Sequence, residues 1–253
     1  MNSPPTVGLF IPCFMNEIYP KACEASYELL VSCGYEVDYP LEQTCCGQPV
    51  ANSGQQKDIK NLARKFVDIF KNYDYIVAPT GSCVCLVKEQ YEEFFGDDED
   101  YQKVKNSTYD LCEFLHDVVK LDKIEASFPH KVGIHNSCHA HRGLGLASAS
   151  ELNVASYSKI KSLLSLVQDI ELVEVARDDE CCGFGGTFAV TQSDVSAAMG
   201  RDKIASHLRS EVEVMTSVDL SCLMHLNGII KKEQKPLEVM HFSQILCGHE
   251  PSL

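Results

Sequence analysis

The chain has 253 residues, 45% of them apolar, which is typical of a globular protein with a sizeable buried core. Its 36 acidic and 22 basic residues give a net charge of −14, which disfavours binding to nucleic acids and anionic membranes. It has no apolar stretch long enough to cross a bilayer and no secretory signal pattern at its start, so we expect a cytoplasmic protein.

The first half of the chain alternates short apolar runs with longer amphipathic stretches. The apolar runs predict strands at residues 7–11, 35–39 and 75–78. The amphipathic stretches predict helices at residues 17–33 and 53–73, the first of them ended by Gly34. Alternation of this kind indicates parallel βαβ units.

The second half follows the same order. Strands are predicted at residues 132–134, 171–175 and 213–215, with a late strand at 239–240. Ser193 or Asp194 is expected to cap a helix that ends near Leu208. We therefore predict an α/β fold of two pseudo-repeated βαβ-type halves, residues 1–127 and 128–253, with short parallel sheets.

The repeat is clearest around the cysteines, of which the chain has 13. A Cys-Cys-Gly triplet occurs at residues 45–47 and again at 181–183. Residues 7–13 (VGLFIPC) align with 132–138 (VGIHNSC), and a Ser-Cys pair follows each triplet. Each half thus has one cysteine before the triplet, two within it and one after it.

These eight cysteines each follow a predicted strand closely. Because the carboxyl ends of parallel strands lie at one edge of a sheet, we expect one four-cysteine site in each half. The predicted cofactor and metal ligands are Cys13, Cys45, Cys46 and Cys83 in the first half, and Cys138, Cys181, Cys182 and Cys222 in the second.

Thiolates are soft ligands that bind zinc or iron–sulfur clusters, and four of them suit either. Structural zinc sites usually use two short Cys-x2–4-Cys knuckles, which are not found here. Adjacent cysteines suit the different irons of a larger cluster, so we expect one [4Fe–4S]-type cluster per half. A zinc-stabilised structural or interaction module is the alternative.

Other candidates near the predicted sites have less definite roles. Cys85 is either a spare ligand or an inward-facing residue, and His225 lies at a ligand-like spacing from Cys222. The remaining cysteines are expected to pack in the core: Cys23, Cys33, Cys112 and Cys247. The sequence shows no Ser–His–Asp arrangement, P-loop or paired-carboxylate motif, so no catalytic residues are predicted.

The cysteine motifs resemble those of the cysteine-rich CCG domain family. The resemblance rests on residues 44–49 (TCCGQP), 79–83 (PTGSC), 179–188 (DECCGFGGTF) and 219–223 (DLSCL), and it extends over nearly the whole chain. The chain is most similar to the short family members that act in lactate utilization. This implies a non-catalytic electron-relay subunit that works with two partner proteins in oxidising L-lactate to pyruvate.

One branch of the family differs in a way that bears on function. In the subunit of heterodisulfide reductase each half ends in Cys-x-x-Cys, and five cysteines hold a non-cubane [4Fe–4S] cluster. Here the halves end Cys83-Val84-Cys85 and Cys222-Leu223-Met224-His225. A disulfide-reducing enzyme of that kind is therefore an alternative only, and the cluster type is open.

Overall fold

The computed structural model describes residues 4–251. The chain forms two compact units that meet in sequence between Phe114 and Leu115. The proposed boundary of the sequence repeat, between residues 127 and 128, stays a prediction. No helix within the described part of the chain is both long enough and apolar enough to cross a membrane.

Each unit contains a four-stranded sheet in which all neighbouring strands run parallel. The first has the order β2-β1-β3-β4, from β1 (Thr6–Leu9), β2 (Glu36–Asp38), β3 (Tyr75–Ala78) and β4 (Thr108–Asp110). The second has the order β6-β5-β7-β8, from β5 (Lys131–Ile134), β6 (Glu171–Val173), β7 (Val214–Ser217) and β8 (Glu238–His241). The identical strand order confirms the predicted α/β fold with two pseudo-repeated halves.

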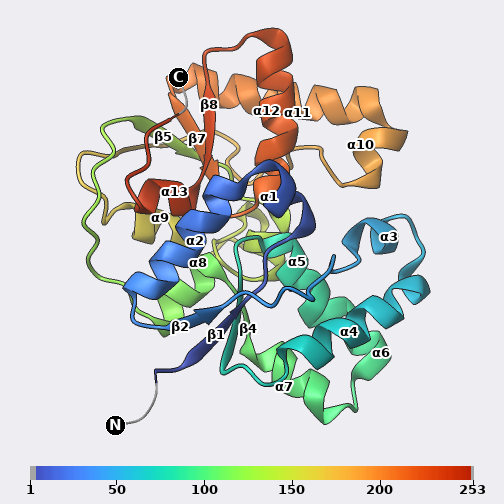
Figure 1. Cartoon of the computed structure of the whole chain (residues 1–253). Helices are drawn as coiled ribbons and strands as arrows, with labels where there is room; N and C mark the ends of the chain where they lie inside the picture. The colour runs from blue at the N-terminus through green and yellow to red at the C-terminus, as the bar shows by residue number, and fades with distance from the viewer. Residues whose placement is uncertain (1–3, 252–253) are drawn as a thin grey trace. The chain divides into compact units, whose positions relative to one another are not determined.

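The helices of the first unit fill the connections between its strands (Figure 1). They are α1 (Cys13–Ile18), α2 (Pro20–Ser32), α3 (Gln48–Asn52), α4 (Lys60–Phe70), α5 (Gly81–Cys85), α6 (Glu92–Phe95), α7 (Glu99–Ser107) and α8 (Leu111–Glu113). Shorter turns extend three of them: a 3-10 turn at Gln56–Ile59 before α4, and π-helical turns at Leu86–Gln90 after α5 and Phe114–Val118 after α8.

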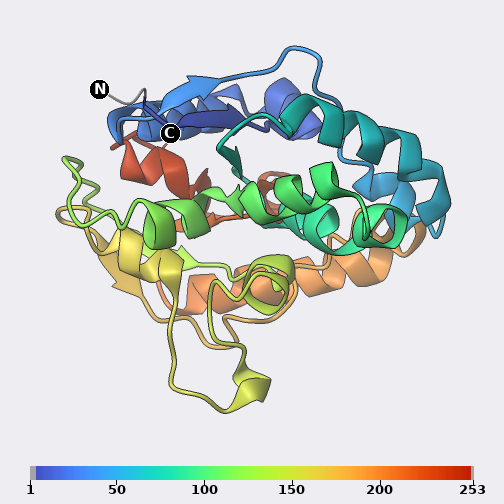
Figure 2. The same cartoon turned by 90° about the horizontal axis from the view of Figure 1, so that it is seen from below.

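The second unit has fewer helices, and two of them are long. They are α9 (Lys159–Leu164), α10 (Thr187–Thr191), α11 (Ser193–Arg209), α12 (Leu220–Glu233) and α13 (Phe242–Leu246), with a π-helical turn at His139–Gly143 and a 3-10 turn at Ser150–Leu152. Helices α11 and α12 lie side by side (Figure 1). Figure 2 shows the connection from the π-helical turn to α9 as a long loop that stands away from the sheet of this unit.

The helix predicted at residues 53–73 is shorter in the structure, as a 3-10 turn and α4, and two further elements of the first unit differ from the prediction. The helix expected at residues 17–33 is instead two helices, because Pro20 cannot continue a helix from Tyr19, which has φ −132° and ψ 51°. The helix does stop at Gly34, which adopts a positive φ of 86°. Strand β4 was not predicted, because its three residues include Thr108 and Asp110, polar side chains that are nevertheless fully buried.

Candidate metal centres

In the first unit, four cysteines follow the three strands β1, β2 and β3. Cys13 is the first residue of α1, Cys45 and Cys46 lie in the loop between β2 and α3, and Cys83 lies in α5. Because β1 lies between β2 and β3 in a parallel sheet, the segments that follow these strands emerge at one edge. Cys46 and Cys83 are buried, Cys45 is partly exposed and Cys13 is exposed.

The four sulfur atoms of the first unit form a continuous chain of contacts. The Cys45 side chain is hydrogen bonded to the side chains of Cys13 and Cys46, and it accepts the backbone N–H of Gly47 at 3.3 Å. The sulfurs of Cys46 and Cys83 lie 3.2 Å apart. The cysteines predicted from the sequence to share a site therefore come together in the order 13, 45, 46, 83.

The second unit repeats this arrangement on β5, β6 and β7. Cys138 directly precedes the π-helical turn after β5, Cys181 and Cys182 lie in the loop after β6, and Cys222 lies in the first turn of α12. The Cys181 side chain is hydrogen bonded to those of Cys138 and Cys182, and the Cys182 side chain is also hydrogen bonded to Cys222. The backbone N–H of Gly183 donates to Cys181 at 3.4 Å.

The first cysteine of each triplet is set up as a thiolate. Hydrogen bonds from Cys13 and then Cys46 lower the pKa of Cys45 to about 2. In the same way, Cys138 and Cys182 lower the pKa of Cys181 to about 2. Conversely, the pKa of Cys13 is raised because its thiol is hydrogen bonded to Cys45 and because neighbouring atoms shield it in part from water. In each site the hydrogen bonds thus favour the thiolate form of one cysteine, Cys45 or Cys181.

Each triplet ends in a glycine because a side chain would not fit there. Gly47 has φ 98°, and a Cβ on it would lie 2.8 Å from the Ile59 side chain. Gly183 has φ 89°, and a Cβ on it would lie 2.6 Å from the backbone oxygen of Ser196. The tight left-handed turn directs the glycine N–H at the sulfur two residues earlier. Such N–H donors stabilise a thiolate ligand.

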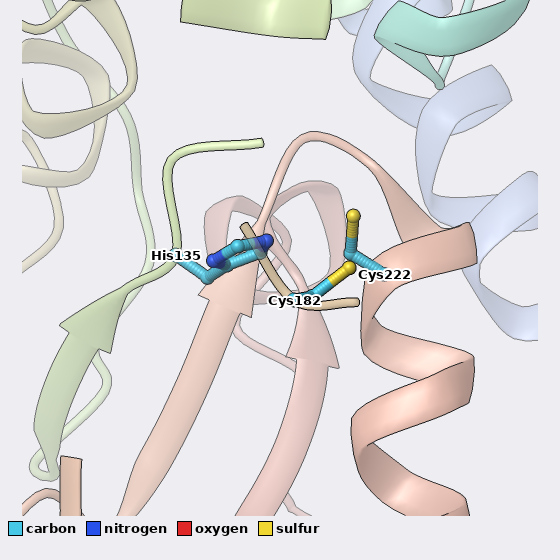
Figure 3. A group of neighbouring side chains, drawn as sticks. All are labelled: His135, Cys182 and Cys222. Atoms are coloured by element: carbon cyan, nitrogen blue, oxygen red, sulfur yellow. The ribbon is translucent and has the colours of Figure 1, made fainter. Parts of the chain in front are cut away.

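The sequence predicts that His135 belongs to a cluster of histidines near the second site, on a polar rim or surface, but the structure buries it within that site. One ring nitrogen of His135 and the sulfurs of Cys182 and Cys222 all lie within 4.8 Å of one another, and all three residues are buried. Figure 3 shows the imidazole, just past the end of β5, directed toward these two sulfurs. The available signal was its position three residues before Cys138, where the first half has Phe10 before Cys13.

Burying the His135 imidazole without hydrogen-bond partners lowers the stability of the fold. It is 1% exposed, and neither ring nitrogen has a hydrogen-bond partner among residues 4–251. An unsatisfied buried polar group costs about 1–3 kcal/mol of stability. Burial, with the nearby charge of Lys203, also lowers the pKa of His135 well below its usual range.

The remaining candidates lie in less specific surroundings. The ring of His225 faces the Ser196 carbonyl oxygen, with its Nε2 3.3 Å away. Cys85 is buried in α5, so its role stays open. Of the four cysteines expected in the core, Cys112 is buried, and the expectation is wrong for Cys23, Cys33 and Cys247, which are partly exposed.

The donor set fits a thiolate-bound metal or cluster. Each site offers four convergent cysteines, one of them held as a thiolate, and a backbone N–H aimed at that sulfur. Soft sulfur donors of this kind suit iron–sulfur clusters and zinc, and disfavour magnesium and calcium. The second site adds an imidazole with no other partner in the described chain.

Comparisons with known proteins agree with the internal repeat. Residues 7–88 and 132–227 each match the family described as cysteine-rich domain, CCG. The chain is 38% identical to lactate utilization protein A of Exiguobacterium sp. over 96% of this chain and 97% of that one. It is 37% identical to lactate utilization protein A of Bacillus licheniformis, over 95% of this chain and 98% of that one.

One solved structure shares the fold at low sequence identity. It is the crystal structure of a hypothetical protein from Helicobacter pylori, with a TM-score of 0.62 and 10% identity. The match covers 98% of this chain but spans only 51% of that protein. At this identity the likeness concerns the fold alone.

Proposed function

Because the chain belongs to the cysteine-rich CCG domain family, we propose that it is an iron–sulfur electron-transfer subunit of a cytoplasmic system that oxidises L-lactate to pyruvate. The observation that carries the proposal is the convergence of four cysteines in each unit, in the same order and at the same strand ends. An iron–sulfur cluster bound there would supply reversible one-electron transfer.

Two features favour a cluster over a zinc ion in the first unit. Cys45 and Cys46 are adjacent, and one small ion is difficult for neighbouring residues to share, whereas a cluster offers separate irons. The N–H of Gly47 is directed at a sulfur, as is common where hydrogen bonds tune the potential of a cluster.

The lactate system is proposed from the names of the relatives that match nearly the whole chain. In that system the chain would relay electrons between partner subunits and would have no catalytic residues of its own. A cytoplasmic location is proposed because free, clustered thiols persist where thiols are kept reduced.

The first test is metal and sulfide analysis of full-length protein purified without oxygen. We expect brown protein that holds several irons and matching acid-labile sulfide. Cys46→Ser and Cys182→Ser should each lower the iron content to about half of the native value. Colourless protein that takes up no iron on anaerobic reconstitution would refute the cluster assignment.

The lactate assignment needs a separate test. The tagged chain, isolated anaerobically from its own cells with bound partner subunits, should lose visible absorbance when L-lactate is added. D-lactate is the control substrate, and the Cys46→Ser/Cys182→Ser double variant is the control protein. Absorbance that L-lactate leaves unchanged in a complex rich in iron would point to another electron donor.

Zinc is the second candidate, and one observation favours it in the second unit. The grouping of His135, Cys182 and Cys222 has the mixed nitrogen and sulfur donors that zinc accepts. Stoichiometric zinc, and unfolding by a chelator, would support a structural module there.

A further inference from the structure

The two sites occupy equivalent places but have different surroundings. His135 follows β5 as Phe10 follows β1, and both backbones are held alike by the neighbouring strand. The backbone N–H of His135 donates to the carbonyl oxygen of Thr216 at 2.7 Å, and that of Phe10 donates to the carbonyl oxygen of Val77 at 2.9 Å. The difference between the halves at this position is therefore one of side-chain chemistry and not of backbone course.

In the first unit the side chain at this position belongs to an aromatic cluster. Phe10 stacks edge-on against Phe66 and Phe70, with ring centroids 4.9 and 5.8 Å apart, and all three side chains are buried. An apolar ring in an apolar cluster has no polar atom that requires a hydrogen-bond partner. Nothing in this packing directs a donor atom at the first site.

In the second unit the corresponding cluster is basic. Lys203 and His207 have the same i, i+4 spacing on α11 as Phe66 and Phe70 on α4. The correspondence is also spatial, since a Cβ on Gly133 would lie 2.8 Å from His207, and one on Gly8 would lie 2.9 Å from Phe70.

The ammonium of Lys203 is hydrogen bonded to other groups than His135. Its ammonium donates to the carbonyl oxygens of Arg177 and Asp178, both at 2.8 Å, in the segment that leads to Cys181. The Nδ1 of His207 is hydrogen bonded to the carbonyl oxygen of Lys203 at 3.0 Å. The imidazole of His135 therefore faces Cys182 and Cys222 with both nitrogens unpaired among residues 4–251.

We infer that His135 binds the metal centre of the second unit through a ring nitrogen, next to Cys182 and Cys222. The second centre then has an imidazole in addition to its thiolates, whereas the first is bound by thiolates alone. The ligands of an iron–sulfur centre set its reduction potential, so the added imidazole makes the two centres differ in potential. The inference rests on the proposed function, because it needs a metal centre at this site.

The test is pulsed electron paramagnetic resonance on anaerobically purified full-length protein in its paramagnetic redox state. A strong nitrogen coupling should appear and should change when the protein is labelled with [15N]histidine. His135→Phe copies the first half and should abolish this coupling and shift the potential of one centre only. His225→Gln, which alters another histidine near the same site, should leave both unchanged; His135→Leu serves if the Phe variant does not fold.

The outcomes separate the two claims. Iron and sulfide in both units without a histidine coupling, or with a coupling that survives His135→Phe, would overturn the inference and leave the proposed function standing. If the protein binds zinc instead, the proposed function fails and X-ray absorption at the zinc edge decides the inference. A nitrogen ligand of zinc that is lost in His135→Phe would support the inference, and zinc bound by sulfur alone in the native protein would overturn it. Protein that binds no metal would overturn both.

Discussion

The sulfur atoms of Cys46 and Cys83 lie 3.2 Å apart, although the two cysteines are 37 positions apart in the chain. Their strands, β2 and β3, flank β1, so both side chains reach the edge at which Cys13 begins α1. Two thiolates on one tetrahedral metal ion lie roughly 3.8 Å apart, so this pair has to widen to accept a metal.

Replacing Cys83 should remove the first centre, whereas replacing Cys85 should not. Residues two apart on a helix point to different faces, so only one of these side chains is directed at Cys46. We expect Cys83→Ser to lose about half of the bound iron and Cys85→Ser to keep it, measured on anaerobically purified protein. The reverse pattern would make Cys85 the ligand.

Cys45 should react as a thiolate at low pH in the metal-free protein. Its pKa of about 2 lies below the ordinary value, so its thiolate fraction, and its rate of alkylation by iodoacetamide, should change little between about pH 5 and pH 8. Burial raises the pKa of Cys23 to about 12, so its rate should rise about tenfold per pH unit.

Mass spectrometry of the labelled peptides measures both rates in one sample. Cys181, with the same kind of hydrogen bonds from its neighbours, should behave like Cys45. A tenfold increase per pH unit at Cys45 would show that its thiol is protonated over this range.

His207 should make the second unit sensitive to acid. Burial lowers its pKa from an ordinary 6.5 to about 4, so between these values the unfolded chain binds a proton that the native state excludes. Stability from this residue is therefore complete above pH 6.5 and is lost as the pH falls toward 4, by about 3 kcal/mol in all.

The matched variant is His207→Phe, because Phe70 occupies the corresponding place in the first unit. Urea unfolding of the metal-free protein at pH 7 and pH 5 should show a smaller loss of stability in the variant than in the native protein. Equal losses would mean that His207 does not carry the effect.

Gly183→Ala should destabilise the protein more than Gly34→Ala. Both glycines have a positive φ, which costs a non-glycine residue about 1–2 kcal/mol. At Gly183 the new Cβ would also meet the backbone oxygen of Ser196 at 2.6 Å, while at Gly34 it meets nothing within 4 Å of the described chain. Midpoints of urea unfolding measure the difference; equal midpoints would mean that the loop after Cys182 relaxes freely.

Much of the fold could be predicted because its signals are local. Strand β3 was predicted with its observed ends, and Gly34 ends a helix as expected. The break at Pro20 was also visible in the sequence but was overridden by the amphipathic pattern around it. Strand β4 was missed because Thr108 and Asp110 are polar, and only the packing around them shows that they are buried.

By itself, the sequence determined the repeat, the α/β class and the eight cysteines that gather in two sets. The loops and helices that come after parallel strands begin at one edge of the sheet, so the pattern of strands and cysteines was enough. Only the tertiary structure decided which sulfurs touch and that His135 joins the second set. Lys203 and His207 lie near His135 but belong to a helix more than sixty residues later in the chain. Such a contact depends on tertiary packing, which no local sequence pattern predicts.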